Sequence, residues 1–482
     1  MNLYTINHSF HYELENLTRA FLPNDKITVK ASDIIPEDLE KPYILSEIDE
    51  KITVTLCAED FKKSLKAEKG EDNELIMATL LYELMSEYTG ITLSWGLLTG
   101  VRPIKLLRKL SEENSSDNAR AYFKEKLLVS DEKLMLAEKI CKKEGSILRL
   151  SREDSFSLYI SIPFCPSRCS YCSFVSQSVE KAKHLIKPYV ELLCSELKET
   201  AKIACSLGLR LETVYMGGGT PTTLEAEHLD RILSTVKENF DLSHLREFTV
   251  EAGRPDTITE EKLAAILRNG CDRLSVNPQT LNPNVLLGIG RRHTVEDFYD
   301  SFSLARKMGF KHINTDLIAG LPGDSPESFK NTIDGILRLS PESVTVHTLS
   351  MKRSSYLTGD RMKLLREDSK AVEKMLRYAY SGLDKNGFEP YYLYRQSKMV
   401  GNMENTGWSK PGFEGLYNVY IMDETHSIFA CGAGAVTKLK DPNCNNIERI
   451  FNFKYPYEYI DRFKELLERK EAIFSFYEAL KS

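Results

Sequence analysis

Residues 161–174 read Ser-Ile-Pro-Phe-Cys-Pro-Ser-Arg-Cys-Ser-Tyr-Cys-Ser-Phe and contain three cysteines, Cys165, Cys169 and Cys172, in the spacing C-x3-C-x2-C. The stretch directly follows an apolar, strand-like run, Leu158–Ile162. Cysteine thiolates are the usual ligands of iron–sulfur clusters, and a loop this short brings three of them together. Because a cubane cluster has four irons, three protein ligands leave one iron open to another ligand. We therefore predict a [4Fe–4S] cluster with an accessible iron at the end of this strand.

A zinc site or a set of disulfides would be the other uses of these cysteines. A structural zinc ion takes four ligands, typically two C-x2-C pairs; no second pair follows here, and His184, the next possible ligand, lies well outside the loop. Disulfides belong to oxidising compartments, and the cysteines outside the loop show no framework spacing: Cys57, Cys141, Cys194, Cys205, Cys271, Cys431 and Cys444. We therefore interpret these cysteines as buried free thiols of a protein in the reducing cytoplasm.

Length and composition narrow the class of protein. A chain of 482 residues predicts two or three domains, and 42% hydrophobic with 28% charged residues is typical of globular proteins. A net charge of -6 gives no general attraction to nucleic acid or anionic membranes. No run of about 20 apolar residues predicts a membrane span, and the first residues show no signal-peptide pattern. We expect a cytoplasmic protein that neither binds nucleic acid nor spans a membrane.

Residues 1–150 are predicted to form an N-terminal α+β domain of unassigned role. Residues 26–30 and 51–56 alternate like half-buried strands. Helical spacing runs over 74–88, with Gly90 as a stop, and again over 131–143, before a charged linker at 143–155. Residues 94–105, Ser-Trp-Gly-Leu-Leu-Thr-Gly-Val-Arg-Pro-Ile-Lys, fit either an anion-binding turn or an interdomain loop pinned by Trp95.

Residues 151–350 alternate regularly between apolar runs and helical patterns, which is typical of a parallel sheet built from βα units. Six such units fall short of the eight of a closed barrel, so we predict an α/β fold with a partial, open βα barrel of about six parallel strands. The predicted strands are 157–162, 211–216, 246–252, 272–277, 311–317 and 342–348. The predicted helices are 183–206, 225–239, 259–269, 294–308, 326–339 and 367–386.

Active sites of barrel-like α/β folds lie at the carboxyl ends of the strands, so unusual residues should gather there. The first strand ends in the cysteine loop, and the second ends in Met216-Gly-Gly-Gly-Thr-Pro-Thr222, where glycines allow a ligand close to the backbone. Further polar residues follow the next three strands: Glu251, Gln279, Arg291 and Asp316. Each of them alone would more commonly be a surface ion pair or a helix cap. Their occurrence at successive strand ends favours one shared ligand site.

Residues 351–482 are predicted to form a C-terminal α+β extension that covers the substrate. Segment 388–396, Phe-Glu-Pro-Tyr-Tyr-Leu-Tyr-Arg-Gln, could hold a large flat molecule, with Arg395 or Lys398 receiving carboxylates. A tyrosine-rich domain core is the alternative. The tail after Tyr455 predicts one or two amphipathic helices that pack back on the barrel.

The cysteine spacing, together with the glycine run and the ordered polar residues, resembles the radical S-adenosylmethionine (SAM) enzymes. The fuller set, from Tyr159 and Ile-Pro-Phe-Cys to Asp316-x-x-x-Gly-Leu-Pro, is similar to the oxygen-independent coproporphyrinogen III oxidase family. Segments 95–103 and 391–396 are similar to its coproporphyrinogen dehydrogenase HemZ branch, which also has an extended N-terminal domain. With these segments the resemblance covers nearly the whole chain.

The resemblance implies a role for each matching residue. Cys165, Cys169 and Cys172 would hold the [4Fe–4S] cluster, whose open iron SAM would chelate. The residues that would contact or adjoin SAM are Tyr159, Gly218, Gly219, Thr220, Glu251, Gln279, Arg291 and Asp316, with Ser350 as a weaker match. A reduced flavodoxin or ferredoxin-type donor would supply the electron that cleaves SAM. The resulting radical would remove a hydrogen atom from the β-carbon of a porphyrinogen propionate. Loss of CO2 and one electron would then leave a vinyl group. Two such rounds would give protoporphyrinogen IX.

Two positions depart from the family pattern. The well-characterised oxidases have a further cysteine where this chain has Phe174, which is what the haem-chaperone-like relatives show, and Asn277-Pro278 replaces a glycine-containing turn. Three functions therefore stay open: decarboxylation of coproporphyrinogen III, haem binding or delivery, and radical SAM chemistry such as methylation on another substrate.

Overall fold

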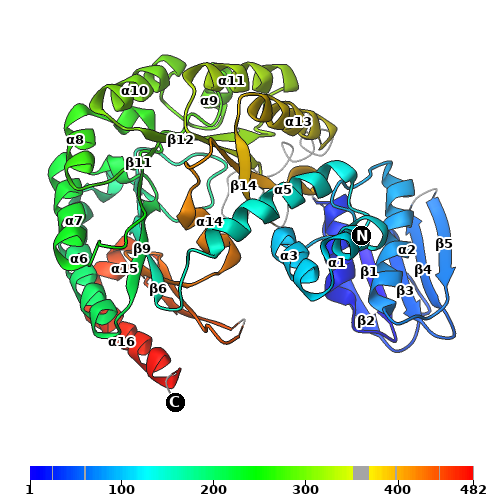
Figure 1. Cartoon of the computed structure of the whole chain (residues 1–482). Coiled ribbons are helices and arrows are strands. Elements are labelled where there is room, and N and C mark those ends of the chain that lie inside the picture. The colour runs from blue at the N-terminus through cyan, green and yellow to red at the C-terminus, as the bar shows by residue number, and fades with distance from the viewer. Residues whose placement is uncertain (24, 59–60, 351–368, 397–398, 445, 481–482) are drawn as a thin grey trace.

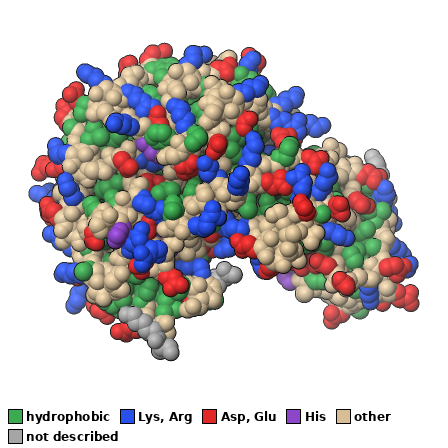
Figure 2. Space-filling view, in the orientation of Figure 1, with side chains coloured by type: hydrophobic (Ala, Val, Ile, Leu, Met, Phe, Trp, Pro, Cys, Tyr) green, Lys and Arg blue, Asp and Glu red, His purple; other side chains and the backbone are tan. Residues whose placement is uncertain are grey.

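The computed structural model describes residues 1–482 except 24, 59–60, 351–368, 397–398, 445 and 481–482. Figure 1 shows two lobes, a small N-terminal one and a larger one in which helices surround a curved, open sheet. Acidic and basic side chains intermingle over the face seen in Figure 2, where a notch separates the N-terminal lobe from the lower part of the large lobe. Within the described part of the chain, no helix is long and apolar enough to cross a membrane.

The N-terminal lobe is a five-stranded sheet in the order β2-β1-β3-β4-β5, covered by two helices. Its own hydrophobic cluster includes Leu3, Val54 and Leu81. The predicted helix at 74–88 is confirmed, and Gly90 ends it in the left-handed conformation (φ 66°). The elements are β1 (Asn2–Ile6), α1 (His11–Phe21), β2 (Thr28–Ser32), β3 (Tyr43–Ile48), β4 (Ile52–Ala58), β5 (Phe61–Ala67) and α2 (Asn73–Thr89).

A helical segment joins the two lobes. It comprises α3 (Pro103–Glu113), α4 (Ser116–Ala121), a π turn (Tyr122–Lys126) and α5 (Asp131–Leu148). The predicted linker over 143–155 is therefore wrong in its first half, because α5 continues to Leu148 and still buries Ile147. Apolar residues from Trp95 to Ile140 belong to the hydrophobic cluster of the large lobe. Packing thus divides the chain near residue 95, whereas the domain boundary was predicted at 150.

The large lobe contains the predicted parallel strands in the predicted order, each followed by its outer helix. These strands are β6 (Ser155–Ile162), β9 (Arg210–Gly218), β10 (Glu247–Glu251), β11 (Arg273–Ser275), β12 (His312–Ala319) and β13 (Ser343–Thr348). The helices are α6 (Val179–Ser206), α7 (Ala226–Asn239), α8 (Glu260–Arg268), α10 (Val295–Met308), α11 (Pro326–Leu339) and α13 (Ser369–Lys385). Shorter elements are β7 (Phe164–Cys165), β8 (Gln177–Ser178), α9 (Pro283–Gly288) and 3-10 turns at Pro221–Thr223 and Pro255–Thr257.

The C-terminal residues extend the barrel sheet at both edges instead of forming a sheet of their own. Strand β15 pairs antiparallel with β13, and β14 pairs antiparallel with β15 at the outer edge. At the other edge β16 pairs parallel with β6, as a seventh parallel strand beyond the six predicted, and is followed by β17 and β18. In Figure 1, α14 lies within the opening of the curved sheet. These elements are β14 (Glu389–Tyr394), a 3-10 turn (Val400–Asn402), β15 (Asn405–Ser409), α14 (Leu416–Asp423), β16 (Ser427–Cys431), β17 (Val436–Lys440) and β18 (Ile447–Phe451). The tail forms the predicted helices α15 (Pro456–Asp461) and α16 (Phe463–Ala479), which pack along α6.

One buried carboxylate links the joining segment to the C-terminal strands. Glu404 is fully buried and accepts hydrogen bonds from Lys133 Nζ at 2.6 Å, Trp95 Nε1 at 2.7 Å and the Tyr380 hydroxyl at 2.8 Å. Burial raises the pKa of Glu404, but these partners outweigh it and hold the pKa below its ordinary value. The interdomain-loop interpretation of residues 94–105 is therefore confirmed for Trp95.

We expect Lys133→Met to lower the free energy of unfolding by about 3–5 kcal/mol, because it leaves the buried Glu404 carboxylate without its cation. The measurement is the urea concentration at the midpoint of unfolding, monitored by tryptophan fluorescence. Lys139→Met is the matched control on the same helix, since Lys139 and Asp384 form an exposed pair at 2.9 Å that should contribute no more than about 1 kcal/mol. Equal midpoints for the two variants would contradict the role of Glu404.

Candidate active site

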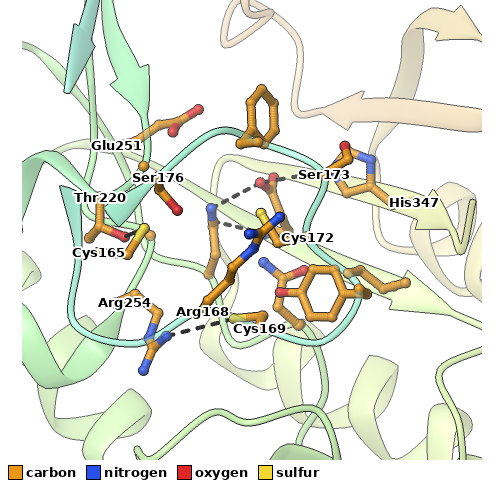
Figure 3. A pocket seen from close by; sticks show the side chains of 18 of the residues that line it. Cys165, Arg168, Cys169, Cys172, Ser173, Ser176, Thr220, Glu251, Arg254 and His347 are labelled. Atoms are coloured by element: carbon orange, nitrogen blue, oxygen red, sulfur yellow. Dashed lines mark hydrogen bonds and ion pairs between the residues drawn. The ribbon is translucent and has the colours of Figure 1, made fainter. Parts of the chain in front are cut away.

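The cysteine loop leaves the end of β6 and returns to it. Gln177 N–H donates to Pro163 O at 2.9 Å at the far end of the loop, and Ser170 N–H donates to Ile289 O at 3.0 Å, just after α9. Cys165, Cys169 and Cys172 all line one cavity of about 260 Å³. Figure 3 shows their sulfurs on different sides of this hollow, with the Arg168 side chain between them. We call this the cysteine cavity.

The thiols stand apart around the cavity rather than at one point. Among the described residues, no three His, Cys, Asp or Glu side chains converge tightly enough to hold a single ion. Cys165 Sγ lies 3.5 Å from Thr220 Oγ1, and Arg254 Nη1 donates to Cys169 Sγ at 3.6 Å. Burial raises the pKa of the Cys165 thiol, and that of Cys172 to about 11, so binding of iron here would release protons.

The glycine run closes tightly on the cysteine loop. Gly219 N–H donates to Ile162 O at 2.7 Å, and Thr220 N–H donates to Phe164 O at 2.8 Å. A Cβ at Gly219 would lie only 2.5 Å from Phe164 O, and Gly218 has a φ of 106°, which favours glycine. All three predicted residues, Gly218, Gly219 and Thr220, line the cysteine cavity.

Glu251 also lines the cavity, at the end of β10. The Tyr215 hydroxyl donates to its Oε1 at 2.5 Å. Burial raises the pKa of Glu251 to about 7, although the hydrogen bonds from Tyr215 and from the Gly218 N–H partly oppose the shift. This carboxyl can therefore accept or donate a hydrogen bond near neutral pH.

Gln279 and Arg291 present unpaired polar atoms to the site. Gln279 has a positive φ of 68°, and its Oε1 is buried without a hydrogen-bond partner among the described residues. Both Nη atoms of Arg291 donate within the protein, to Asn277 O at 2.6 Å, to Gly253 O at 3.2 Å and to the Tyr171 hydroxyl at 3.2 Å. Its Nε alone has no such partner, so Arg291 does not offer the free planar fork that was expected to meet a carboxylate.

Asp316 belongs to a small polar network on β12, three residues before the strand ends. It accepts hydrogen bonds from Asn277 Nδ2 at 2.9 Å and Asn314 Nδ2 at 2.8 Å, and it lies 3.8 Å from His347 Nε2. Burial raises the pKa of Asp316, but His347 and the hydrogen bonds outweigh it and bring the pKa below its ordinary value. Glu251 and Asp316 thus have pKa values shifted in opposite directions within one cavity.

Tyr159 is the one predicted site residue that does not line the cysteine cavity. It lines a second cavity of about 690 Å³, in which its ring lies 6.4 Å from that of Tyr215 and 6.2 Å from that of Tyr417. We call this the large cavity. Seven residues line both cavities: Ser173, Phe174, Gly218, Glu251, Asp316, His347 and Tyr394. The two cavities therefore adjoin along a shared wall.

The prediction that Arg395 receives carboxylates of a ligand is wrong. Its guanidinium is buried and donates to Leu98 O at 2.6 Å and Asn402 O at 3.0 Å, because it supports residues 98–101 rather than a ligand. Lys398 lies outside the described residues. Tyr392 and Tyr394 line the large cavity, while Tyr391 and Tyr392 belong to a small buried aromatic cluster. The aromatic core is therefore confirmed for Tyr391 and Tyr392, and the binding of a large flat molecule stays a prediction.

Four site residues were missed from the sequence: Tyr171, Arg254, Asn277 and His347. Arg254, Asn277 and His347 lie at or just after the ends of β10, β11 and β13, so the strand-end rule could have found them. Tyr171 had no such signal, because only its contact with Arg291 reveals it.

The donor set fits a [4Fe–4S] cluster and SAM. Three thiols surround one cavity, and its wall contains an unpaired buried acceptor at Gln279, an unpaired donor at Arg291 and a glycine backbone with no room for a side chain. Buried polar atoms without partners are costly unless a ligand completes them.

Arg254→Met should lower the reduction potential of the reconstituted cluster, since Arg254 places a cation and a hydrogen bond at Cys169, and such contacts favour the reduced state. We expect the reduction potential to fall by about several tens of millivolts, which corresponds to on the order of a tenfold change in the equilibrium constant for one-electron reduction. An EPR-monitored redox titration without SAM measures it. Arg292→Met is the control, since Arg292 is 70% exposed and pairs with Glu180. An unchanged potential in fully loaded Arg254→Met protein would contradict this role.

SAM binding should strengthen as the pH rises through about 7, the pKa of Glu251. A ribose hydroxyl needs the carboxylate as acceptor, so the proton competes with the ligand, by up to about tenfold per pH unit below the pKa. Equilibrium dialysis from about pH 6 to about pH 8 tests this. Glu251→Gln should bind more weakly without this dependence. The same pH dependence in Glu251→Gln would assign it to another group.

Comparisons with known proteins identify the family of the chain. Residues 159–336 match the family model of the radical SAM superfamily. The oxygen-independent coproporphyrinogen-III oxidase-like protein HemZ of Bacillus subtilis is 37% identical over 475 residues, which cover 95% of this chain and 94% of that protein. The heme chaperone HemW of Lactococcus lactis is 33% identical over 301 residues, covering 62% of this chain and 73% of that protein.

Among solved structures, the coproporphyrinogen III oxidase HemN of Escherichia coli superposes with a TM-score of 0.50 at 22% identity, covering 66% of this chain and 71% of that one. At this identity the likeness shows the fold alone. The chain therefore belongs to the oxygen-independent coproporphyrinogen-III oxidase-like family of the radical SAM superfamily, whose cofactors are a [4Fe–4S] cluster and SAM.

Proposed function

We propose that the protein catalyses the oxygen-independent oxidative decarboxylation of coproporphyrinogen III, in which propionate side chains become vinyl groups. The nearly full-length similarity to a protein named coproporphyrinogen-III oxidase-like supports this, since it includes the N-terminal lobe. The HemN likeness supports the same fold for the reacting lobe.

The observation that carries the proposal is the shared wall of the two cavities. The cysteine cavity suits the cluster and SAM, while the large cavity, at about 690 Å³, falls in the size range of pockets that enclose organic ligands. Its walls are mainly aromatic and apolar, with Tyr159, Tyr215 and Tyr417 stacked on one side. A substrate there would place its reacting carbon beside the shared residues.

The chain's own residues would then bind the cluster and SAM and orient the substrate. Cys165, Cys169 and Cys172 would hold the cluster, which together with SAM supplies hydrogen-atom abstraction from an unactivated carbon. Glu251 would accept hydrogen bonds from hydroxyl groups, and Asp316 would stay ionised beside His347. The propionate loses one hydrogen atom, one electron and CO2 to become a vinyl group. A flavodoxin or ferredoxin-type protein would donate the initiating electron, and a one-electron acceptor would take the final one.

Haem binding is the second candidate, and Phe174 is the observation that favours it. This side chain is 62% exposed and lies on the wall shared by both cavities, where the sequence resembles the haem-chaperone relatives. The similarity to the chaperone HemW covers 62% of the chain, against 95% for the oxidase-like protein, so we rank haem binding second.

An anaerobic assay tests the proposal. Reconstituted protein, SAM, a chemical reductant and coproporphyrinogen III are incubated and followed by mass spectrometry. We expect loss of two carboxyl groups with equivalent 5′-deoxyadenosine. The Cys169→Ala variant should form neither product, because it lacks one cluster ligand. Intact porphyrinogen in the presence of a SAM-cleaving cluster would refute the proposal, and tight haem binding by that same protein would then select the second candidate.

A further inference from the structure

The large cavity differs in charge between its two sides. The wall that it shares with the cysteine cavity contains the carboxyl groups of Glu251 and Asp316. The rest of its lining comes from the barrel strands, from β14 and from α14 with β16–β18, and this last group includes Lys438 on β17 and Lys454 after β18. Apolar side chains lie between these ends, among them Ile421, Ile428 and Val436.

Of the four basic side chains that line the large cavity, two are already occupied. Arg273 donates to His312 Nε2 at 2.8 Å, to Ser343 Oγ at 3.1 Å and to Phe413 O at 3.3 Å. His347 lies against Asp316. Lys454 only lies over the ring of Tyr455, at 5.6 Å from its centroid. Lys438 Nζ makes no hydrogen bond or ion pair with any residue that the structure describes.

Lys438 is unpaired although a carboxylate is near. Glu424, at the end of α14, is bound by Arg102 and lies 3.6 Å from Arg449. Burial lowers the pKa of Lys438, and Arg102 and Arg449 lower it further against the opposing effect of Glu424. A partly buried ammonium surrounded by more cations than anions is a favourable place for an incoming carboxylate.

This arrangement gives the Gly100-Val-Arg-Pro103 motif a purpose that an interdomain loop does not explain. Arg102 precedes α3 and pairs with Glu424, and Lys105 donates to Asp423 O at 3.0 Å in the same turn of α14. The joining segment therefore fixes the end of the helix that lines the large cavity. By holding Glu424, Arg102 prevents Glu424 from neutralising Lys438.

We propose that Lys438 and Lys454 bind carboxylate side chains of a cyclic tetrapyrrole in the large cavity, and that Arg102 keeps Lys438 available by holding Glu424. The inference rests on the proposed function and deepens it, because coproporphyrinogen and haem both present propionate carboxylates on a tetrapyrrole. With two carboxylates at the basic end, a ring lying across the apolar walls brings the opposite propionates toward Phe174 and the cysteine cavity.

The test measures binding of coproporphyrin III, a stable tetracarboxylate, to the reconstituted full-length protein without reductant, by the change in porphyrin fluorescence. Mesoporphyrin, with two carboxylates, is compared in the same assay. Haemin, which does not fluoresce, is compared by the shift of its Soret absorbance. We expect Lys438→Met to weaken coproporphyrin III binding by about tenfold or more, the loss that follows from removing one charge-assisted hydrogen bond. Lys438→Arg should retain most of the affinity. Lys202→Met, an exposed lysine on α6 paired with Glu199, should leave it unchanged.

Arg102 is tested through a pair of variants. Arg102→Met should weaken coproporphyrin III binding several-fold because Glu424, then held only by Arg449 at 3.6 Å, can also pair with Lys438. The double variant Arg102→Met/Glu424→Gln should restore affinity, since the competing carboxylate is then absent. Restored affinity also excludes misfolding as the cause, and circular dichroism with iron content checks every variant.

The outcomes separate this inference from the proposed function. Equal coproporphyrin III affinity of the wild type and Lys438→Met would overturn the inference, and failure of the double variant to recover would overturn the role of Arg102. A wild type that binds no porphyrin would overturn the inference and leave the decarboxylation assay to judge the proposed function. Lysine-dependent binding without decarboxylation in that assay would support the inference while refuting the proposed function. Lysine-dependent binding of haemin alone would overturn the assignment of a tetracarboxylate substrate.

Discussion

The closure between the ends of β6 and β9 is the contact on which the rest of the site depends. Two backbone hydrogen bonds, from Gly219 to Ile162 and from Thr220 to Phe164, join the glycine run to the start of the cysteine loop. A side chain at Gly219 would collide with the Phe164 carbonyl. Because this closure is made by backbone on both sides, the cysteine loop leaves the sheet from a constrained position. The thiols, the glycine backbone and Glu251 consequently face the same cavity.

Two chemically similar carboxyl groups of the site, those of Glu251 and Asp316, have different pKa values because their surroundings differ. Glu251 and Asp316 are both buried carboxyl groups of one cavity, yet burial raises the pKa of Glu251 to about 7 while His347 and two asparagines hold that of Asp316 low. One can exchange a proton near neutrality and the other stays charged. Shifted pKa values of opposite direction in one cavity are typical of functional sites.

The open barrel also explains the positions of the C-terminal strands and of the joining segment. A sheet of six parallel strands leaves two free edges, and the C-terminal strands cover both of them. Helix α14 then lies in the opening, and its end is held by cations from the joining segment. The buried Glu404, which receives Trp95 and Lys133, makes a second junction between the same parts. The large cavity is lined by residues between Tyr159 and Lys454, and the joining segment holds the end of α14, which forms part of its wall.

Much of the fold and of the candidate site could be predicted from the sequence alone. Strands and helices follow from local periodicity, and parallel strands bring their carboxyl ends to one edge, so Cys165, Glu251, Gln279 and Asp316 were expected together before any coordinates. Tertiary structure alone decided the pairing partners of charged groups. Arg395 supports a loop, Arg254 reaches Cys169, and Glu424 is held by Arg102 rather than by Lys438. The parallel insertion of β16 beside β6 was equally invisible, since it joins residues about 270 positions apart. Local sequence determines which residues end each strand, whereas contacts between distant segments determine which of their charges remain free to bind a ligand.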